Sequence, residues 1–168
     1  MSEQDARKMF RKLVVAMRYL HSIGVAHRDL KAENILLSST ESDEIGLIDF
    51  GLAFEWEEDM GSEMKEKSQN RIMGTSYYMA PEVMEKDYDE RCDVWGLGVM
   101  LYIMTTASPP FQGSSDSEIL LNVSKYRYIT GGEFSELSML LRHLIKSILV
   151  PKEQRPTLSQ ILQHPWLS

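Results

Sequence analysis

Apolar residues near the N-terminus recur three or four positions apart, which predicts one long amphipathic helix that buries a single face. Ser2 and Asp5 resemble a capping box at its start, and Gly24 favours an end just after Ser22. The apolar positions that define this face are Phe10, Leu13, Val14, Met17, Leu20 and the neighbouring His21.

The pattern then changes. Two short apolar runs, residues 35–37 and 45–48, stand on either side of a polar turn, which predicts a small β-hairpin. From residue 52 to residue 79 no periodicity remains, and acidic and basic side chains crowd a segment with few apolar residues. We interpret this segment as a long loop.

The second half of the chain is predicted to be helical. A short helix follows Pro81, and residues 93–102 are apolar on every side, as expected for a central core helix that Pro109 and Pro110 bring to an end. Thr157 with Gln160 resembles a second capping box. Further helices are expected around residues 117–123, 139–149 and 158–162. The sequence therefore predicts one mainly α domain with a little sheet.

Charge and composition narrow the function classes. The 168 residues are 43% hydrophobic and carry a formal charge of −7, from 25 acidic and 18 basic residues. This balance argues against a nucleic-acid partner and suits a basic peptide. The apolar run at residues 94–104 is too short to cross a bilayer, so no membrane partner is expected. A single cysteine, Cys92, favours a buried apolar role in a reducing compartment, and we expect a cytoplasmic protein, with the nucleus left open.

Three motifs carry the candidate chemistry. Residues 27–34 spell H-R-D-L-K-A-E-N, residues 49–51 spell D-F-G, and residues 80–82 spell A-P-E. In this order they resemble the signature set of the protein kinases. The resemblance covers nearly all of residues 1–168 and implies the C-terminal, or large, lobe of a kinase domain. Residues 49–82 then correspond to the activation segment.

The resemblance assigns roles to the loop residues. Phosphoryl transfer needs neutralised phosphate charge and an aligned hydroxyl group. Asp29 is expected to orient the substrate hydroxyl and accept its proton, and Lys31 to offer a cation to the phosphoryl group. Asn34 and Asp49 are expected to bind Mg²⁺. The expected cofactors are Mg²⁺ and ATP. The residues expected to contact them are Lys31, Glu33, Asn34, Leu36 and Asp49.

Other positions match the supporting parts of the family. His27 and Phe50 resemble a hydrophobic column between lobes, Asp93 resembles the carboxylate that fixes the catalytic loop, and Glu82 with Arg155 resembles a buried ion pair. By the same resemblance, Gly51 is expected to permit a turn, Arg28 to dock a phosphate, and Glu33 and Thr75 to form a substrate platform. Ser68 is a candidate phosphosite, and its alternative is an ordinary surface serine. Gly96 and Gly98 are expected to permit close helix packing.

The resemblance extends to a subgroup. Lys31 and residues 74–78 resemble Ser/Thr kinases rather than tyrosine kinases. Residues 88–95, 109–111 and 164–166 resemble the calcium/calmodulin-regulated group, in particular the calcium-dependent protein kinases. The expected partner is therefore a protein substrate with Ser or Thr near basic residues.

The 168 residues contain neither a Gly-rich phosphate loop nor a V-A-I-K-like lysine, and no calcium-binding loop pattern. We therefore expect an N-terminal lobe to be missing, and weak ATP binding with negligible transfer by this chain alone. The alternatives left open are a catalytically silent lobe that serves as an interaction module and, more remotely, a small-molecule phosphotransferase. The physiological substrate and the oligomeric state cannot be read from the sequence.

Overall fold

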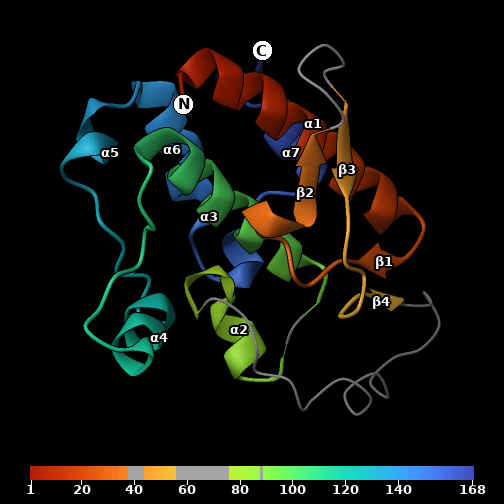
Figure 1. Ribbon diagram of the computed structural model, residues 1–168, viewed down its shortest axis with the longest axis horizontal. Coiled ribbons are helices and arrows are strands. Elements are labelled where there is room, and N and C mark those ends of the chain that lie inside the picture. The colour runs from red at the N-terminus through yellow and green to blue at the C-terminus, as the bar shows by residue number, and fades with distance from the viewer. Residues whose placement is uncertain (38–43, 56–75, 88) are drawn as a thin grey trace.

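A computed structural model describes residues 1–37, 44–55, 76–87 and 89–168, and its described part is mostly helical (Figure 1). The elements follow in the order α1 (Glu3–Ser22), β1 (Val25–Ala26), the 3₁₀ turn η1 (Ala32–Asn34), β2 (Ile35–Leu37), β3 (Ile45–Leu47), β4 (Phe54–Glu55), η3 (Ser76–Tyr78), α2 (Pro81–Met84), α3 (Arg91–Thr106), α4 (Asp116–Ser124), α5 (Glu133–Glu136), α6 (Met139–Ile148), η4 (Lys152–Gln154), α7 (Leu158–Leu162) and η5 (Pro165–Leu167).

The long first helix forms as its periodicity predicted. The Ser2 hydroxyl oxygen accepts a hydrogen bond from the Asp5 backbone N–H at 3.2 Å, which caps the start of α1. Beyond its end, Gly24 has a φ of 75°, a left-handed conformation that glycine adopts without steric cost. Most of the apolar face is buried: Phe10, Leu13, Val14 and Met17 are inaccessible to solvent, whereas Leu20 and His21 are partly buried.

Helix α3 occupies the centre of the molecule, between α1 and α6 (Figure 1). A Cβ atom added at Gly96 would lie 3.2 Å from Cβ of Leu30, and one added at Gly98 would collide with Ile148 of α6. The prediction that these glycines permit close packing is confirmed. The predicted end was wrong: α3 stops at Thr106, where Ala107 adopts a left-handed φ of 57°, before either proline.

The strands form two small antiparallel pairs in the described residues. The predicted hairpin is confirmed, since β2 pairs with β3 with Ile35 opposite Leu47. The second pair, β1 with β4, was not predicted and lies partly in the segment assigned to a loop. The 3₁₀ turn η3 also lies there. Each of these elements has two or three residues, too few for a periodic pattern to reveal.

The C-terminal helices are short. The capping box of α7 is confirmed, with Gln160 N–H donating to the Thr157 hydroxyl at 3.2 Å and Thr157 N–H donating to the Gln160 amide oxygen at 2.8 Å. Helix α6 forms where predicted, but Met139 is 76% exposed and so does not join the core. Helix α5 was missed. Cys92 is buried, as expected, and burial raises the pKa of its thiol well above the usual value.

No helix in the described part of the chain combines the length and the apolar character that crossing a bilayer requires.

A buried ion pair joins α2 to the segment before α7. Nη2 of Arg155 donates to Oε2 of Glu82 at 2.8 Å, and Nη1 donates to the other carboxylate oxygen. The guanidinium also donates to the backbone oxygens of Val150 and Arg91, both at 3.0 Å, and lies over the ring of Trp95. The predicted pairing is confirmed, and its geometry is bidentate.

Replacing Arg155 with methionine should leave the Glu82 carboxylate buried without its charge partner. We expect Arg155→Met to lower the free energy of unfolding by about 3–5 kcal/mol. The matched control is Lys152→Met, because Lys152 pairs with Asp87 at 2.9 Å where that carboxylate is largely exposed, and an exposed pair contributes about 0–1 kcal/mol. Urea unfolding of both variants measures the difference, and equal losses would contradict the structural role.

Candidate active site

Asp29 lies in the loop that connects β1 to η1, and two neighbours fix its carboxylate. Nζ of Lys31 lies 2.6 Å from Oδ2 of Asp29. The single turn of η1 brings Asn34 back toward the loop, where its Nδ2 donates to Oδ2 of Asp29 at 3.0 Å and to the Asp29 backbone oxygen at 2.8 Å. The side chain of Asp29 is 15% exposed, so the carboxylate is held but still accessible.

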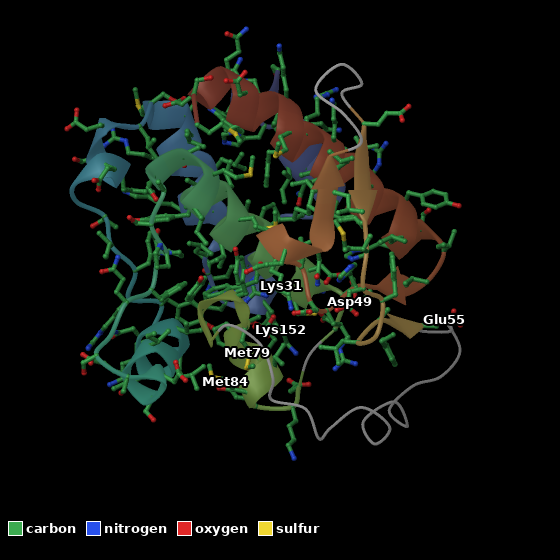
Figure 2. All side chains as sticks on the ribbon, in the orientation of Figure 1. Lys31, Asp49, Glu55, Met79, Met84 and Lys152 are labelled. Atoms are coloured by element: carbon green, nitrogen blue, oxygen red, sulfur yellow. The ribbon has the colours of Figure 1, made fainter. Side chains whose placement is uncertain are left out.

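Lys31 is a cation at neutral pH. Its hydrogen bond to Asp29 raises the pKa of the ammonium group, burial acts in the opposite direction, and the charges of Asp29, Glu33 and Asp49 raise the pKa further. The contribution of Asp49 indicates that this carboxylate lies within electrostatic reach of Lys31. Figure 2 labels Lys31 and Asp49 in the central part of the molecule, next to the β2–β3 hairpin.

Asp49 lies two residues beyond the end of β3. The backbone N–H of Ile48 donates to the backbone oxygen of Asn34 at 3.0 Å, which fixes the end of β3 against η1. Asp49 itself has the left-handed φ of 62°, and its Oδ1 accepts a hydrogen bond from Gly51 N–H at 3.2 Å. A Cβ at Gly51 would lie 3.0 Å from that oxygen. A side chain at position 51 would therefore crowd the Asp49 carboxylate, while the left-handed backbone angle belongs to Asp49.

The donor set suits a hard divalent cation. Because Asn34 directs its amide nitrogen at Asp29, its amide oxygen is directed elsewhere. That oxygen and the exposed Asp49 carboxylate are the ligand types that Mg²⁺ takes, together with phosphate and water oxygens. Among the residues that the structure describes, no group of three or more His, Cys, Asp or Glu side chains could hold a metal ion. Asn34 and Asp49 offer the oxygen types that a magnesium ion bound together with phosphate would take.

The buried carboxylate of Asp93, at the start of α3, holds the loop from behind. Its Oδ1 accepts from Arg28 N–H at 2.7 Å and its Oδ2 accepts from His27 N–H at 2.9 Å. Nε2 of His21 lies 2.9 Å from the same Oδ2. Arg28 has a left-handed φ of 65°, which a non-glycine residue adopts at a cost. Asp93 thereby holds a strained backbone next to Asp29.

His27 connects this loop to the segment after β3. Its Nδ1 accepts from Asp29 N–H at 3.3 Å, so Nε2 carries the hydrogen and donates to the Ile48 backbone oxygen at 3.1 Å. The ring also packs against Phe50, with centroids 4.9 Å apart. Three large apolar side chains of the hairpin and the segment after it, Leu36, Ile48 and Phe50, are 52%, 38% and 44% exposed.

Sequence reasoning missed two contributors. His21 was assigned only to the periodic face of α1, and no local pattern connects it to a carboxylate 72 residues away. Tyr78, in η3, lies against η1: burial raises its pKa to about 12, although a hydrogen bond with the Ala32 backbone acts to lower it. Tyr78 therefore joins the end of the 49–82 segment to the catalytic turn.

The remaining predicted residues are placed as follows. Glu33 is exposed on η1, close enough to Lys31 to raise its pKa. Arg28 is partly buried beside Asp29. Thr75 and Ser68 lie outside the described residues, as does most of the predicted activation segment.

Comparison with known proteins identifies the family. Residues 1–167 match the family described as protein kinase domain. The chain belongs to the protein kinase family. It is 41% identical over 168 residues to calcium-dependent protein kinase 3 of Plasmodium berghei, and 37% identical to calcium-dependent protein kinase 4 of Plasmodium falciparum and to calcium-dependent protein kinase 29 of Arabidopsis thaliana. These alignments cover 98–99% of the chain.

The chain spans only about three tenths of the length of these relatives, between 29% and 31%. The predicted fold class, a mainly α kinase large lobe with a small hairpin, is confirmed by the family match and by the described elements. The predicted similarity to calcium-dependent protein kinases is confirmed as well. Protein kinases as a family use ATP and Mg²⁺ and act on proteins.

Asp93→Asn tests how the loop is held. Asparagine offers one acceptor oxygen and presents an N–H₂ group where a second acceptor is needed, which should cost about 1–3 kcal/mol. We expect faster hydrogen exchange at the His27 and Arg28 amides, followed by NMR. Asp116→Asn, at an exposed position in the first turn of α4, is the control and should leave both amides protected. Unchanged protection in Asp93→Asn would contradict the role given to Asp93.

Proposed function

We propose that this chain is the catalytic large lobe of a protein serine/threonine kinase, which transfers the γ-phosphoryl group of ATP to a Ser or Thr hydroxyl of a protein. The observation that carries the proposal is the fixed Asp29 carboxylate, held by Lys31 at 2.6 Å and Asn34 at 3.0 Å beside Asp49. The kinase relatives named above support it. Small-molecule phosphotransfer is disfavoured, because it gives no reason for the peptide-platform sequence at residues 74–82.

Asp29 is the proposed general base. Its carboxylate is accessible and oriented, so it can accept a hydrogen bond from a substrate hydroxyl and take the proton as the hydroxyl attacks phosphorus. Lys31, charged at neutral pH, can stabilise negative charge that develops on the transferred group. Asn34 has two functions: its amide nitrogen orients Asp29, and its amide oxygen serves as a ligand.

Asn34 and Asp49 are the proposed magnesium ligands. The bound cation would neutralise phosphate charge during transfer. The protein contributes the placement of these oxygens: the Ile48–Asn34 backbone hydrogen bond sets their spacing, and the Gly51 N–H orients the Asp49 carboxylate. Leu36, exposed on β2, is the proposed surface beneath the adenine.

Substrate choice is proposed from the acidic character of the chain. Glu33 is exposed on the turn that follows Lys31, and the formal charge is −7, so peptides with Arg or Lys before the target residue should be preferred. We further propose Thr75 as part of the peptide platform, Ser68 as a phosphosite whose phosphate Arg28 would dock, and a cytoplasmic location.

A second candidate function is a silent interaction lobe. The exposed apolar side chains of Leu36, Ile48 and Phe50 favour it, because a partner could cover them. In the kinase proposal that partner is an N-terminal lobe. Reading the coding sequence upstream of Met1 discriminates between them: a Gly-rich loop and a strand lysine there support the enzyme, and a stop codon supports the silent lobe.

Asp29→Asn should abolish most activity in a polypeptide that carries both lobes. We expect kcat to fall by about 10²–10⁴-fold, because the amide cannot accept the hydroxyl proton, while ATP affinity changes little. Phosphate incorporation into a basic peptide library measures this and tests the preference for Arg or Lys. Glu136→Gln, at an exposed position on α5, should keep full activity. An active Asp29→Asn enzyme would exclude the proposed base.

The 168-residue chain alone should bind Mg·ATP weakly, with a dissociation constant above about 1 mM by calorimetry. The reason is that the described residues supply the magnesium ligands and one apolar surface, whereas the Gly-rich loop and the strand lysine that hold the phosphates are not in this sequence. Robust ATP turnover by the purified chain would contradict this expectation.

A further inference from the structure

Two imidazole rings contact each other where the C-terminal turn meets α6. Nδ1 of His143, on α6, lies 2.9 Å from Nε2 of His164, and the rings stack with centroids 5.1 Å apart and 18° between their planes. His164 directly precedes η5, and its Nδ1 accepts a hydrogen bond from Trp166 N–H at 3.2 Å. The histidine pair therefore links α6 to the start of η5.

The hydrogen-bond partners fix which nitrogen of each neutral ring carries the proton. Because Nδ1 of His164 accepts from a backbone N–H, the hydrogen of this ring must be on Nε2. Nε2–H then donates to Nδ1 of His143, so the hydrogen of His143 must be on its own Nε2. Both rings are neutral in this arrangement, and each bond depends on the other.

A single added proton breaks the chain of bonds. If Nδ1 of His143 is protonated, it faces the Nε2–H of His164, and donor meets donor. The contact between the rings can survive if the hydrogen of His164 moves to Nδ1. That nitrogen then no longer accepts from Trp166 N–H, and the cap of η5 is lost. Every singly protonated form therefore lacks one of the two hydrogen bonds, and a second proton adds charge repulsion.

The turn η5, which His164 caps, packs against the N-terminal half of α1. Trp166 is fully buried, packs edge-to-face on Phe10 with centroids 6.3 Å apart, and donates from Nε1 to Oε2 of Glu3 at 3.2 Å. Arg7 lies over its ring at 5.5 Å. Figure 1 shows the C-terminus beside this part of α1. Loosening η5 would therefore loosen the first turns of α1.

We propose that His143 and His164 form a pH-sensitive latch, which fastens residues 164–167 to α6 only while both imidazoles are neutral. The device is independent of the phosphotransfer site, because neither histidine belongs to the residues that surround Asp29. Acidification releases the C-terminal turn and, with it, the Trp166 contacts on α1.

The charged groups near the histidine pair are permanent cations, which disfavour protonation of the two rings, and one carboxylate. On α1, Arg7 and Arg11 face η5 as permanent cations, with Arg11 donating to the Leu167 backbone oxygen at 3.2 Å. Glu3 is the acid there. Burial acts to raise its pKa, but hydrogen bonds from Ser138 and Trp166 and the charge of Arg7 lower the pKa of Glu3 overall. On α6, His143 stands between the cations Arg142 and Lys146 in sequence.

The direction of the pH effect follows from linkage. Burial, and secondly the charge of His143, lower the pKa of His164 in the folded protein. The unfolded chain consequently binds more protons near pH 6, and stability is lost as pH falls through the unfolded histidine value of about 6.5. Above that pH the latch contributes fully.

Hydrogen exchange of the 168-residue chain at pH 7.5 and pH 5.5, corrected for intrinsic rates, tests the proposal. We expect the Trp166 amide to lose protection by about five- to tenfold at the lower pH, the effect of losing one cap. The capped Gln160 amide of α7 has no titrating partner and serves as the internal reference.

The matched variant is His143→Gln with His164→Asn. Asparagine at 164 can still cap Trp166 N–H, and neither new side chain titrates, so the acid-induced loss should disappear while His21 and His27 remain in place. A loss of equal size in this variant would overturn the proposal. Imidazole ¹⁵N spectra of the unmodified chain give a second test: both rings should carry the hydrogen on Nε2 at pH 7.5, and an Nδ1–H form of His164 would refute the latch even if the variant fails to fold.

Discussion

The geometry of the site depends on a buried carboxylate at the start of the central helix. Asp93 accepts hydrogen bonds from the backbone N–H groups of His27 and Arg28, one of which has a left-handed φ. A buried carboxylate is costly unless donors surround it, and a left-handed arginine is costly unless its surroundings hold it. The two backbone N–H groups satisfy the buried carboxylate, and the carboxylate in turn holds Arg28 in its left-handed conformation. The conformation of the loop before Asp29 therefore depends on the position of α3.

From that anchor the active-site groups are placed by short connections. Asp29 follows the two held amides, the turn η1 returns Asn34 to it, and the backbone hydrogen bond from Ile48 to Asn34 brings in Asp49. The Glu82–Arg155 pair has a corresponding function at the other end of the 49–82 segment, where it fixes α2 against the core.

The family match and the described geometry carry different parts of the conclusion. Membership of the protein kinase family rests on the match over residues 1–167. The proposed roles of Asp29, Lys31, Asn34 and Asp49 rest on their chemistry and their contacts, and Leu36 and Phe50 are exposed apolar side chains. The His143–His164 pair stands apart from both, since its proposed behaviour follows from the hydrogen bonds and burial of the two rings.

The sequence by itself determined the elements whose signals are local. The periodic face of α1, the hairpin around residues 35–47, the capping box at Thr157 and the three ordered motifs were all predictable, because each depends on residues close together in the chain. The β1–β4 pairing, the contact of His21 with Asp93 and the histidine pair were decided by the tertiary structure. Their partners are separated by 21 to 72 residues or are too short to show a period, so only the packed chain brings them within hydrogen-bond distance.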